Sequence, residues 1–175
     1  MVQYKIIVAC TEDGGIGINN KIPWTIPQDM KHFKDITTNT HNYGFINVVI
    51  MGKNTWLSLP KKFKPLSNRI NIIISTSLDN DTINGAIVVK SLDEAHNTIN
   101  QFSFIESVFI IGGEGLYREA LYNHRYTHIY LTLIHKHYKC DKFFPIKSLK
   151  ARYKKFSEEK NDNYSFLEFI QDDSI

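Results

Sequence analysis

The sequence predicts an α/β fold with three layers, in which helices flank a central, mostly parallel, twisted sheet. Short β-branched runs alternate with helical stretches over residues 1–125, which is the pattern of βαβ units. The runs are apolar almost throughout, as strands of a sheet covered on both faces must be. After residue 126 strands follow one another with little helix between them. We therefore expect about eight strands with an antiparallel C-terminal edge, and about four helices.

The strands are expected where β-branched and aromatic residues gather. These runs are Tyr4–Ala9, Asn47–Met51, Ile70–Ser75, Ala86–Val89, Ser107–Ile111, Thr127–Leu133, Tyr153–Glu159 and Tyr164–Gln171. The polar residues at 161–163 predict a hairpin turn between the last two.

The helices are expected between these strands, at Pro27–Ile36, Thr55–Leu59, Leu92–Phe102 and Gly115–Tyr122. Pro27 suits a first helical position. Ser91 predicts an N-cap, and Glu94 completes a capping box with it. Polar loops are expected at 37–44 and 79–84.

Length and composition limit the function classes. The chain has 175 residues, 42% of them hydrophobic, which predicts a single domain over residues 1–175. A net charge of +3 is too small, and the lysine clusters too sparse, for a nucleic-acid stripe. Solvated faces explain those clusters better than attraction of an anionic small molecule does.

The remaining signals are those of a cytoplasmic protein. Two cysteines, one of them in an apolar strand, indicate a reducing compartment. No signal peptide or membrane-spanning run is recognisable, and the scattered histidines predict no metal site. A monomer is the default expectation.

Glycines follow two of the predicted strands, at the edge where open α/β sheets bind ligands. Gly112 and Gly113 precede one helix, and Gly52 with Lys53 precedes another. Free N–H groups at helix starts bind phosphate, and two such sites would suit a dinucleotide. Plain tight turns explain each site equally well when it is taken alone. The glycine-rich residues 13–20 could cover a bound ligand or form only a flexible turn.

Two charged side chains complete the pattern. Asp29 lies in the first turn of a predicted helix, with Trp24 before it and Phe33 four residues later on the same face. An acid beside an aromatic ring suits a flat heterocycle with an amidine-like edge. Arg69 precedes an apolar strand and could clamp a carboxylate bidentately. Alone, an ordinary helix start and a surface arginine remain the simpler interpretations.

Taken in order, these residues resemble dihydrofolate reductase over nearly the whole chain. The motifs that carry the resemblance are Gly15–Gly17, Ile22–Trp24 with Pro27 and Asp29, Val49–Gly52 with Thr55 and Trp56, Arg69–Asn71, Ile111–Gly113 with Tyr117, Tyr130–Thr132, and Asp141 with Phe144 and Pro145. No single motif decides the matter, but their ordered occurrence is specific.

The resemblance implies NADPH-dependent reduction of 7,8-dihydrofolate to tetrahydrofolate, by hydride transfer to C6 with Asp29 helping to protonate N5. It implies catalytic roles for Asp29, Trp24, Ile22 and Thr132. Thr132 would bond Asp29, and Trp24 would order a water nearby. It implies that the substrate contacts Val8, Ala9, Asp29, Phe33, Ser58, Leu59, Leu66, Arg69, Ile111, Tyr117 and Thr132. Arg69 would clamp the glutamate α-carboxylate, and antifolates would bind at the same place.

The resemblance also implies the cofactor site. Its residues would be Ala9, Ile16, Gly17, Gly52, Lys53, Asn54, Thr55, Ser75, Thr76, Lys90, Ile111, Gly112, Gly113, Glu114, Gly115, Leu116 and Tyr117. Asn54 and Thr76 stand where relatives often carry a basic residue, which leaves Lys53 as the main partner for the 2′-phosphate. The pathway implied is one-carbon metabolism, with thymidylate and purine synthesis.

Two other functions compete with this one. The first is a different pterin- or pyrimidine-ring reductase with the same fold, such as the riboflavin-pathway type, but Asp29 after Trp24 and Pro27 argues against it. The second is a non-catalytic module that binds folate or a protein, although the acid, the glycines and Arg69 are all present.

Overall fold

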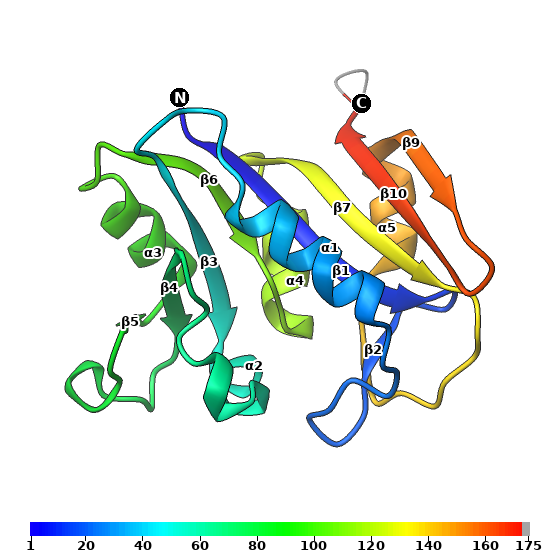
Figure 1. The fold of residues 1–175 in the computed structure, drawn as a ribbon, viewed down its shortest axis with the longest axis horizontal. Coiled ribbons are helices and arrows are strands. Elements are labelled where there is room, and N and C mark those ends of the chain that lie inside the picture. The colour runs from blue at the N-terminus through cyan, green and yellow to red at the C-terminus, as the bar shows by residue number, and fades with distance from the viewer. Residues whose placement is uncertain (173–175) are drawn as a thin grey trace.

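The computed structural model describes residues 1–172, and for Thr82 the backbone only. Its main sheet confirms the predicted eight strands (Figure 1). They are β1 (Gln3–Thr11), β3 (Ile46–Gly52), β4 (Arg69–Ile74), β5 (Ala86–Val89), β6 (Ile105–Ile110), β7 (Tyr126–Ile134), β9 (Tyr153–Lys160) and β10 (Tyr164–Gln171). Their spatial order is β5-β4-β3-β6-β1-β7-β10-β9.

Most of the sheet is parallel, as predicted. Strands β5, β4, β3, β6, β1 and β7 pair in parallel, whereas β10 pairs antiparallel with both β7 and β9. The hairpin between β9 and β10 is closed by the Asn161 N–H, which donates to the Tyr164 carbonyl at 2.9 Å. The carboxyl ends of the parallel strands therefore meet along one edge.

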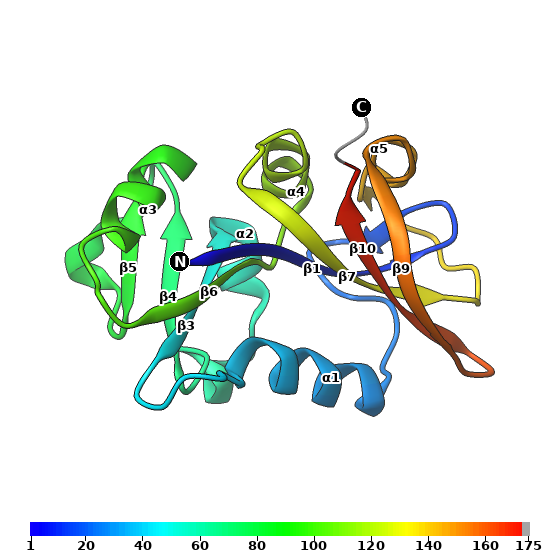
Figure 2. The same cartoon turned by 90° about the horizontal axis from the view of Figure 1, so that it is seen from above.

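Helices cover both faces of the sheet (Figure 2). Helix α1 (Pro27–Thr38) crosses one face, while α3 (Leu92–Ile99), α4 (Glu114–Leu121) and α5 (Ile146–Arg152) pack on the other. The short α2 (Lys53–Ser58) follows β3, and two 3₁₀ turns occupy Lys61–Phe63 and Asn80–Thr82. Two apolar clusters fill the layers, one beneath α3, α4 and α5 and the other beneath α1.

All four predicted helices are present, and their bounds differ from expectation by one to three residues. Helix α2 begins at Lys53 rather than Thr55, and α4 begins at Glu114 rather than Gly115. The Glu94 N–H donates to Ser91 Oγ at 3.1 Å, and the Glu94 carboxylate accepts from the Lys90 N–H, so Ser91 is the N-cap. Helix α3 stops at Ile99, three residues earlier than predicted. Helix α1 continues to Thr38 because the Thr37 and Thr38 hydroxyls donate to carbonyls one turn back, at 2.7 and 2.6 Å.

Three elements were not predicted: helix α5 and strand β8 in the C-terminal half, and strand β2 in the glycine-rich loop. Helix α5 lies where little helix was expected. The sequence did not reveal it because its seven residues bury only Leu149 and carry three basic side chains. Strands β2 (Gly15–Gly17) and β8 (Lys142–Phe143) pair in a separate small sheet. Strands of two or three residues have no readable period.

A buried polar pair lies beneath α3. His96 is 2% exposed and its Nε2 lies 2.9 Å from the Tyr126 hydroxyl, while Tyr126 is fully buried. The Tyr4 ring packs edge-on against both. Burial lowers the pKa of His96, so the folded protein holds a neutral imidazole there.

Replacing Tyr126 by Phe removes the partner of His96 Nε2 and leaves a buried polar atom unpaired. We expect the free energy of unfolding to fall by about 1–3 kcal/mol. Tyr122, which is 53% exposed, supplies the control, and Tyr122→Phe should shift stability by less than about 0.5 kcal/mol. Urea denaturation at pH 7.5 measures both. Equal stabilities for the two variants would contradict the role given to the pair.

Candidate active site

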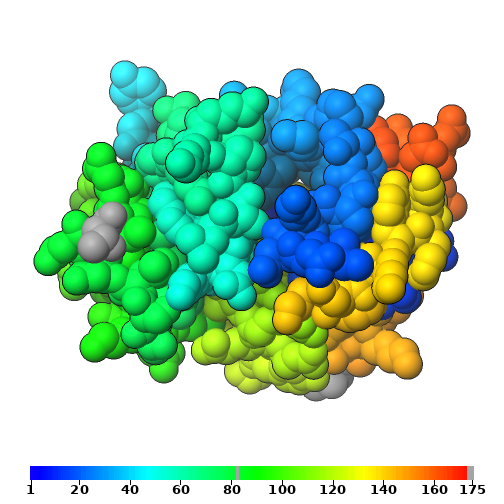
Figure 3. All heavy atoms as spheres, turned by 90° about the horizontal axis from the view of Figure 1, so that it is seen from below, coloured from blue at the N-terminus to red at the C-terminus, as the bar shows by residue number. Residues whose placement is uncertain are grey.

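One pocket of about 1550 Å³ opens at the carboxyl edge of the parallel strands. Figure 3 shows the hollow between the residues near 52–66, helix α1 and the loop that carries β2. Ligand pockets are usually about 300–1,000 Å³, so this one has room for two ligands side by side. All residues proposed from the sequence for catalysis, substrate and cofactor contact line it.

Asp29 and Thr132 meet inside this pocket. Thr132 on β7 is 3% exposed, and its hydroxyl donates to Asp29 Oδ1 at 2.7 Å. Asp29 comes from the first turn of α1, so the hydrogen bond joins two residues that are 103 positions apart. Burial raises the pKa of the Asp29 carboxyl, and the Thr132 hydrogen bond and nearby His32 oppose the rise.

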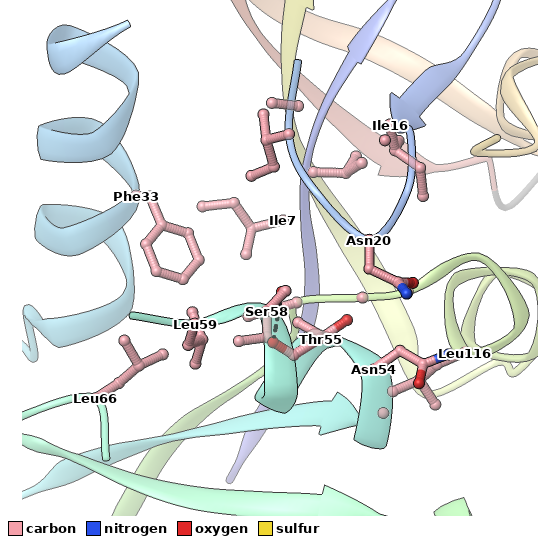
Figure 4. A pocket seen from close by; sticks show the side chains of 18 of the residues that line it. Ile7, Ile16, Asn20, Phe33, Asn54, Thr55, Ser58, Leu59, Leu66 and Leu116 are labelled. Carbon is pink, nitrogen blue, oxygen red and sulfur yellow. Dashed lines mark hydrogen bonds between the residues drawn. The ribbon is translucent and has the colours of Figure 1, made fainter. Parts of the chain in front are cut away.

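Residues of the loop before α1 differ in how deeply they are buried. Trp24 is 7% exposed and its ring lies 5.5 Å from that of Tyr138. Ile22 lines the pocket, yet 66% of it is exposed. Asn20, which the sequence did not single out, points toward the pocket in Figure 4.

Apolar side chains form the wall opposite the loop (Figure 4). Phe33 of α1, Leu59 and Leu66 belong to the apolar cluster beneath α1. Ile7 joins them and was missed, whereas Val8 packs in the cluster on the other side of the sheet. Alternation along β1 with Ala9 could have identified Ile7.

Arg69 is held at the far end of this wall. Its Nε donates to the Ser67 carbonyl at 2.8 Å and its Nη1 to Thr37 Oγ1 at 2.9 Å. Its guanidinium also lies 5.9 Å from the centre of the Phe33 ring. Burial lowers the pKa of Arg69, which nevertheless stays charged. Thr37 is fully buried and was missed, because the sequence placed it in a loop.

The glycine pair forms the floor of the pocket. Gly112 has φ 121°, a backbone conformation that favours glycine, and a Cβ there would make a tight contact of 3.2 Å with the Tyr117 ring. The Gly52 N–H donates to the Gly112 carbonyl at 2.8 Å, which ties the ends of β3 and β6 together. The buried Tyr117 hydroxyl donates to the Ile7 carbonyl at 2.9 Å. Burial raises the pKa of Tyr117.

The polar end of the pocket contains Lys53. Its Nζ lies 2.8 Å from Ser77 Oγ, a residue that the sequence did not single out. Ser75 Oγ accepts from the N–H groups of Ser77 and Leu78, which shapes the turn after β4. Glu114 lies 3.6 Å from Arg118 at the start of α4, so its negative charge has a partner beside the glycine pair.

Two absences hold for residues 1–172. No group of three or more His, Cys, Asp or Glu residues there is arranged to hold a metal ion. In the same residues, none of the helices has the length and apolar character that crossing a bilayer requires.

Comparison with known proteins agrees with this geometry. A family described as dihydrofolate reductase matches residues 3–170. The dihydrofolate reductase of Schistosoma mansoni is 41% identical over 148 residues, which cover 82% of this chain and 78% of that protein. The dihydrofolate reductase of Drosophila melanogaster is 35% identical over 146 residues, covering 83% and 80%.

Longer relatives contain the same region. The bifunctional dihydrofolate reductase-thymidylate synthase of Glycine max is 36% identical over 177 residues, covering 96% of this chain and 33% of that protein. The chain thus spans about a third or less of the bifunctional relatives it matches. The family match over residues 3–170, together with the relatives that it covers by more than two thirds, shows that this chain belongs to the dihydrofolate reductase family.

Proposed function

We propose that the protein catalyses the NADPH-dependent reduction of 7,8-dihydrofolate to tetrahydrofolate, with hydride transfer to C6 and protonation of N5. One observation carries the proposal: a part-buried carboxylate, Asp29, bonded to Thr132 inside a pocket with apolar walls. A carboxylate there can accept two parallel hydrogen bonds from the amidine-like edge of a pterin. Its raised pKa keeps a proton available nearer to neutral pH.

The far end of the pocket supports the same substrate. Arg69 is oriented by Ser67 and Thr37, and its remaining N–H groups are free to pair with a carboxylate. Phe33, one turn after Asp29 and beneath the Arg69 guanidinium, forms with Leu59 and Leu66 an apolar wall that suits a flat ring system followed by an aminobenzoyl group. Binding at both ends would hold the ring in a fixed position relative to the acid. Such alignment of reacting groups accelerates a reaction.

The residues at the other side of the pocket fit a dinucleotide. A Cβ at Gly112 would occupy the space beside Tyr117, and Gly113 begins α4 without a side-chain cap, which leaves N–H groups of the first turn for phosphate. Lys53, Ser75 and Ser77 would hold the 2′-phosphate, and Lys90 would lie near the adenosine. Bound NADPH supplies the hydride. Tyr117, Ile16 and Ala9 would keep its nicotinamide against the substrate and exclude water.

We also propose that residues 1–175 form one domain that works as a cytoplasmic monomer, serves one-carbon metabolism and binds antifolates. Cys10 and Cys140 are both free thiols, which suits a reducing compartment.

Asp29→Asn tests the acid. We expect turnover of dihydrofolate at pH 7 to fall by about 10²–10⁴-fold, with a smaller loss at pH 5, where solvent protonates the substrate more readily. The unaltered enzyme should lose activity as pH rises through the raised pKa of Asp29, because the protonated fraction falls. Asp35→Asn on the same helix is the control, since Asp35 pairs with exposed Lys31.

The same variant should also change the free energy of unfolding in a direction that can be predicted. A carboxyl whose folded pKa is raised takes up its proton more readily in the folded state, so the charged form destabilises the fold above that pKa. Asp29→Asn should therefore raise the free energy of unfolding at pH 7 while activity falls. Full neutral-pH turnover in this variant would show that Asp29 is not the acid.

Arg69→Leu tests the clamp. We expect affinity for dihydrofolate to fall by about 10–150-fold, the equivalent of a hydrogen bond to a charged group. A pyrimidine antifolate without a glutamate tail should lose far less. Arg152→Leu is the control, because the Arg152 guanidinium also lies over an aromatic ring, that of Tyr122. Equal losses for the two ligands would contradict the clamp.

Lys53→Ala tests cofactor choice. We expect the ratio of kcat/KM for NADPH to that for NADH to fall by about tenfold or more, since a charge-assisted contact to the 2′-phosphate is lost. Lys61→Ala, on the nearby 3₁₀ turn, should leave the ratio unchanged. A parallel loss with both cofactors would refute the phosphate contact.

A further inference from the structure

Trp24, Asp29 and Thr132 are the residues proposed to act in proton delivery. Of these three, only Trp24 lies outside a helix or strand. Asp29 lies on α1 and Thr132 on β7, whereas Trp24 belongs to the irregular stretch before α1. Its indole is nevertheless only 7% exposed. A buried indole on a loop needs a packing partner from elsewhere in the chain to define its orientation.

The first half of that loop is held by hydrogen bonds to Asp141 and by a bridge within the loop. The Asp141 N–H donates to the Gly17 carbonyl at 2.9 Å, and the Asn19 N–H donates to Asp141 Oδ2 at 3.1 Å. Ile18 and Lys21 then bridge to each other. These bonds end at Lys21, three residues before the indole.

The second half is held by a ring contact. Tyr138 comes from the segment between β7 and β8, which Figure 1 shows passing beside the loop of β2. Its ring centre lies 5.5 Å from that of Trp24, with the planes inclined at 59°. This is the range of favourable aromatic pairs. Lys136 Nζ lies 5.4 Å from the centre of the same tyrosine ring, a second contact that restrains it.

We propose that Tyr138 is a positioning residue for the reaction, which fixes the Trp24 indole and through it the water that carries the proton to the substrate. Tyr138 is absent from the pocket lining, so it acts only through Trp24. The inference rests on the proposed function, since it needs a proton-delivery step to affect.

Three substitutions separate ring packing from simple bulk and from the hydroxyl group. Tyr138→Ala removes the ring, Tyr138→Leu keeps volume without an aromatic face, and Tyr138→Phe keeps the ring. Tyr122→Ala is the matched control, because Tyr122 also lies against a basic side chain, Arg152, but packs against no residue of the loop.

We expect Tyr138→Ala to lower kcat for dihydrofolate at pH 7 by about threefold to tenfold, the range that one aromatic pair can supply. The KM for NADPH should stay within about twofold, because cofactor contacts are untouched. The primary deuterium isotope effect on kcat, measured with deuterated NADPH, should rise as the chemical step becomes slower. Tyr138→Phe should restore the parent values, and Tyr138→Leu should restore them only in part.

Tryptophan fluorescence gives a second readout that needs no turnover. Trp56 is buried in the core and contributes a constant background, so Tyr138→Ala should shift the emission to longer wavelength as Trp24 gains solvent. Tyr138→Phe should not shift it.

Two outcomes would overturn the positioning role: kcat, isotope effect and emission all unchanged in Tyr138→Ala, or losses no larger than those of Tyr122→Ala. An inactive parent protein would instead refute the proposed function, and the emission shift would then decide the Trp24–Tyr138 contact by itself.

Discussion

A part-buried carboxylate is the constraint around which the site is arranged. Placing an ionised acid in an apolar pocket is costly unless it is hydrogen-bonded. The structure provides Thr132, whose hydroxyl donates to Asp29 at 2.7 Å, and the positive end of the α1 dipole. This bond joins α1 to β7, and it adds to the packing of Phe33 and Ile36 that holds the helix on the sheet.

The floor of the pocket is backbone, and hydrogen bonds tie its parts together. Strands β3 and β6 are tied at their ends by the Gly52–Gly112 hydrogen bond, and Tyr117 ties α4 to β1 through the Ile7 carbonyl. Gly112 accommodates the positive φ and the nearby tyrosine ring because it has no Cβ. Above this hydrogen-bonded floor, parts of the walls come from loops, as Trp24 and the residues around Leu59 do.

The sequence predicted the sheet well, because strands buried on both faces leave a strong signal. Val48, Val49, Ile50 and Met51 are all 0% exposed. Other features depend on contacts between distant segments and leave no local trace. The partnership of Asp29 with Thr132 came from resemblance, since nothing local joins residues 103 positions apart.

Thr37 illustrates the limit of local reasoning best. A threonine after an apolar helix face ordinarily signals a loop, and here its hydroxyl instead bonds back to the Phe33 carbonyl and accepts from Arg69. Helix α5, with one buried side chain, had no apolar stripe to reveal it. Its Leu149 and the partly buried Ile146 pack into the apolar cluster beneath α3, α4 and α5.

The spacing of residues along α1 finally explains what kind of ligand the pocket can take. Asp29, Phe33 and Thr37 recur every four residues, so they form one stripe along the helix. Asp29 and Phe33 line the pocket, and Thr37 is buried behind Arg69, to which its hydroxyl is bonded. The first supplies a negative charge, the second an aromatic wall, and the third orients Arg69. Within residues 1–172, Arg69 forms no ion pair, because its protein partners are a carbonyl and a hydroxyl. Eight residues of helix separate the two ends by about 12 Å. A ligand that pairs with both ends carries N–H donors at one and a carboxylate at the other, and an aromatic group between them would pack on Phe33.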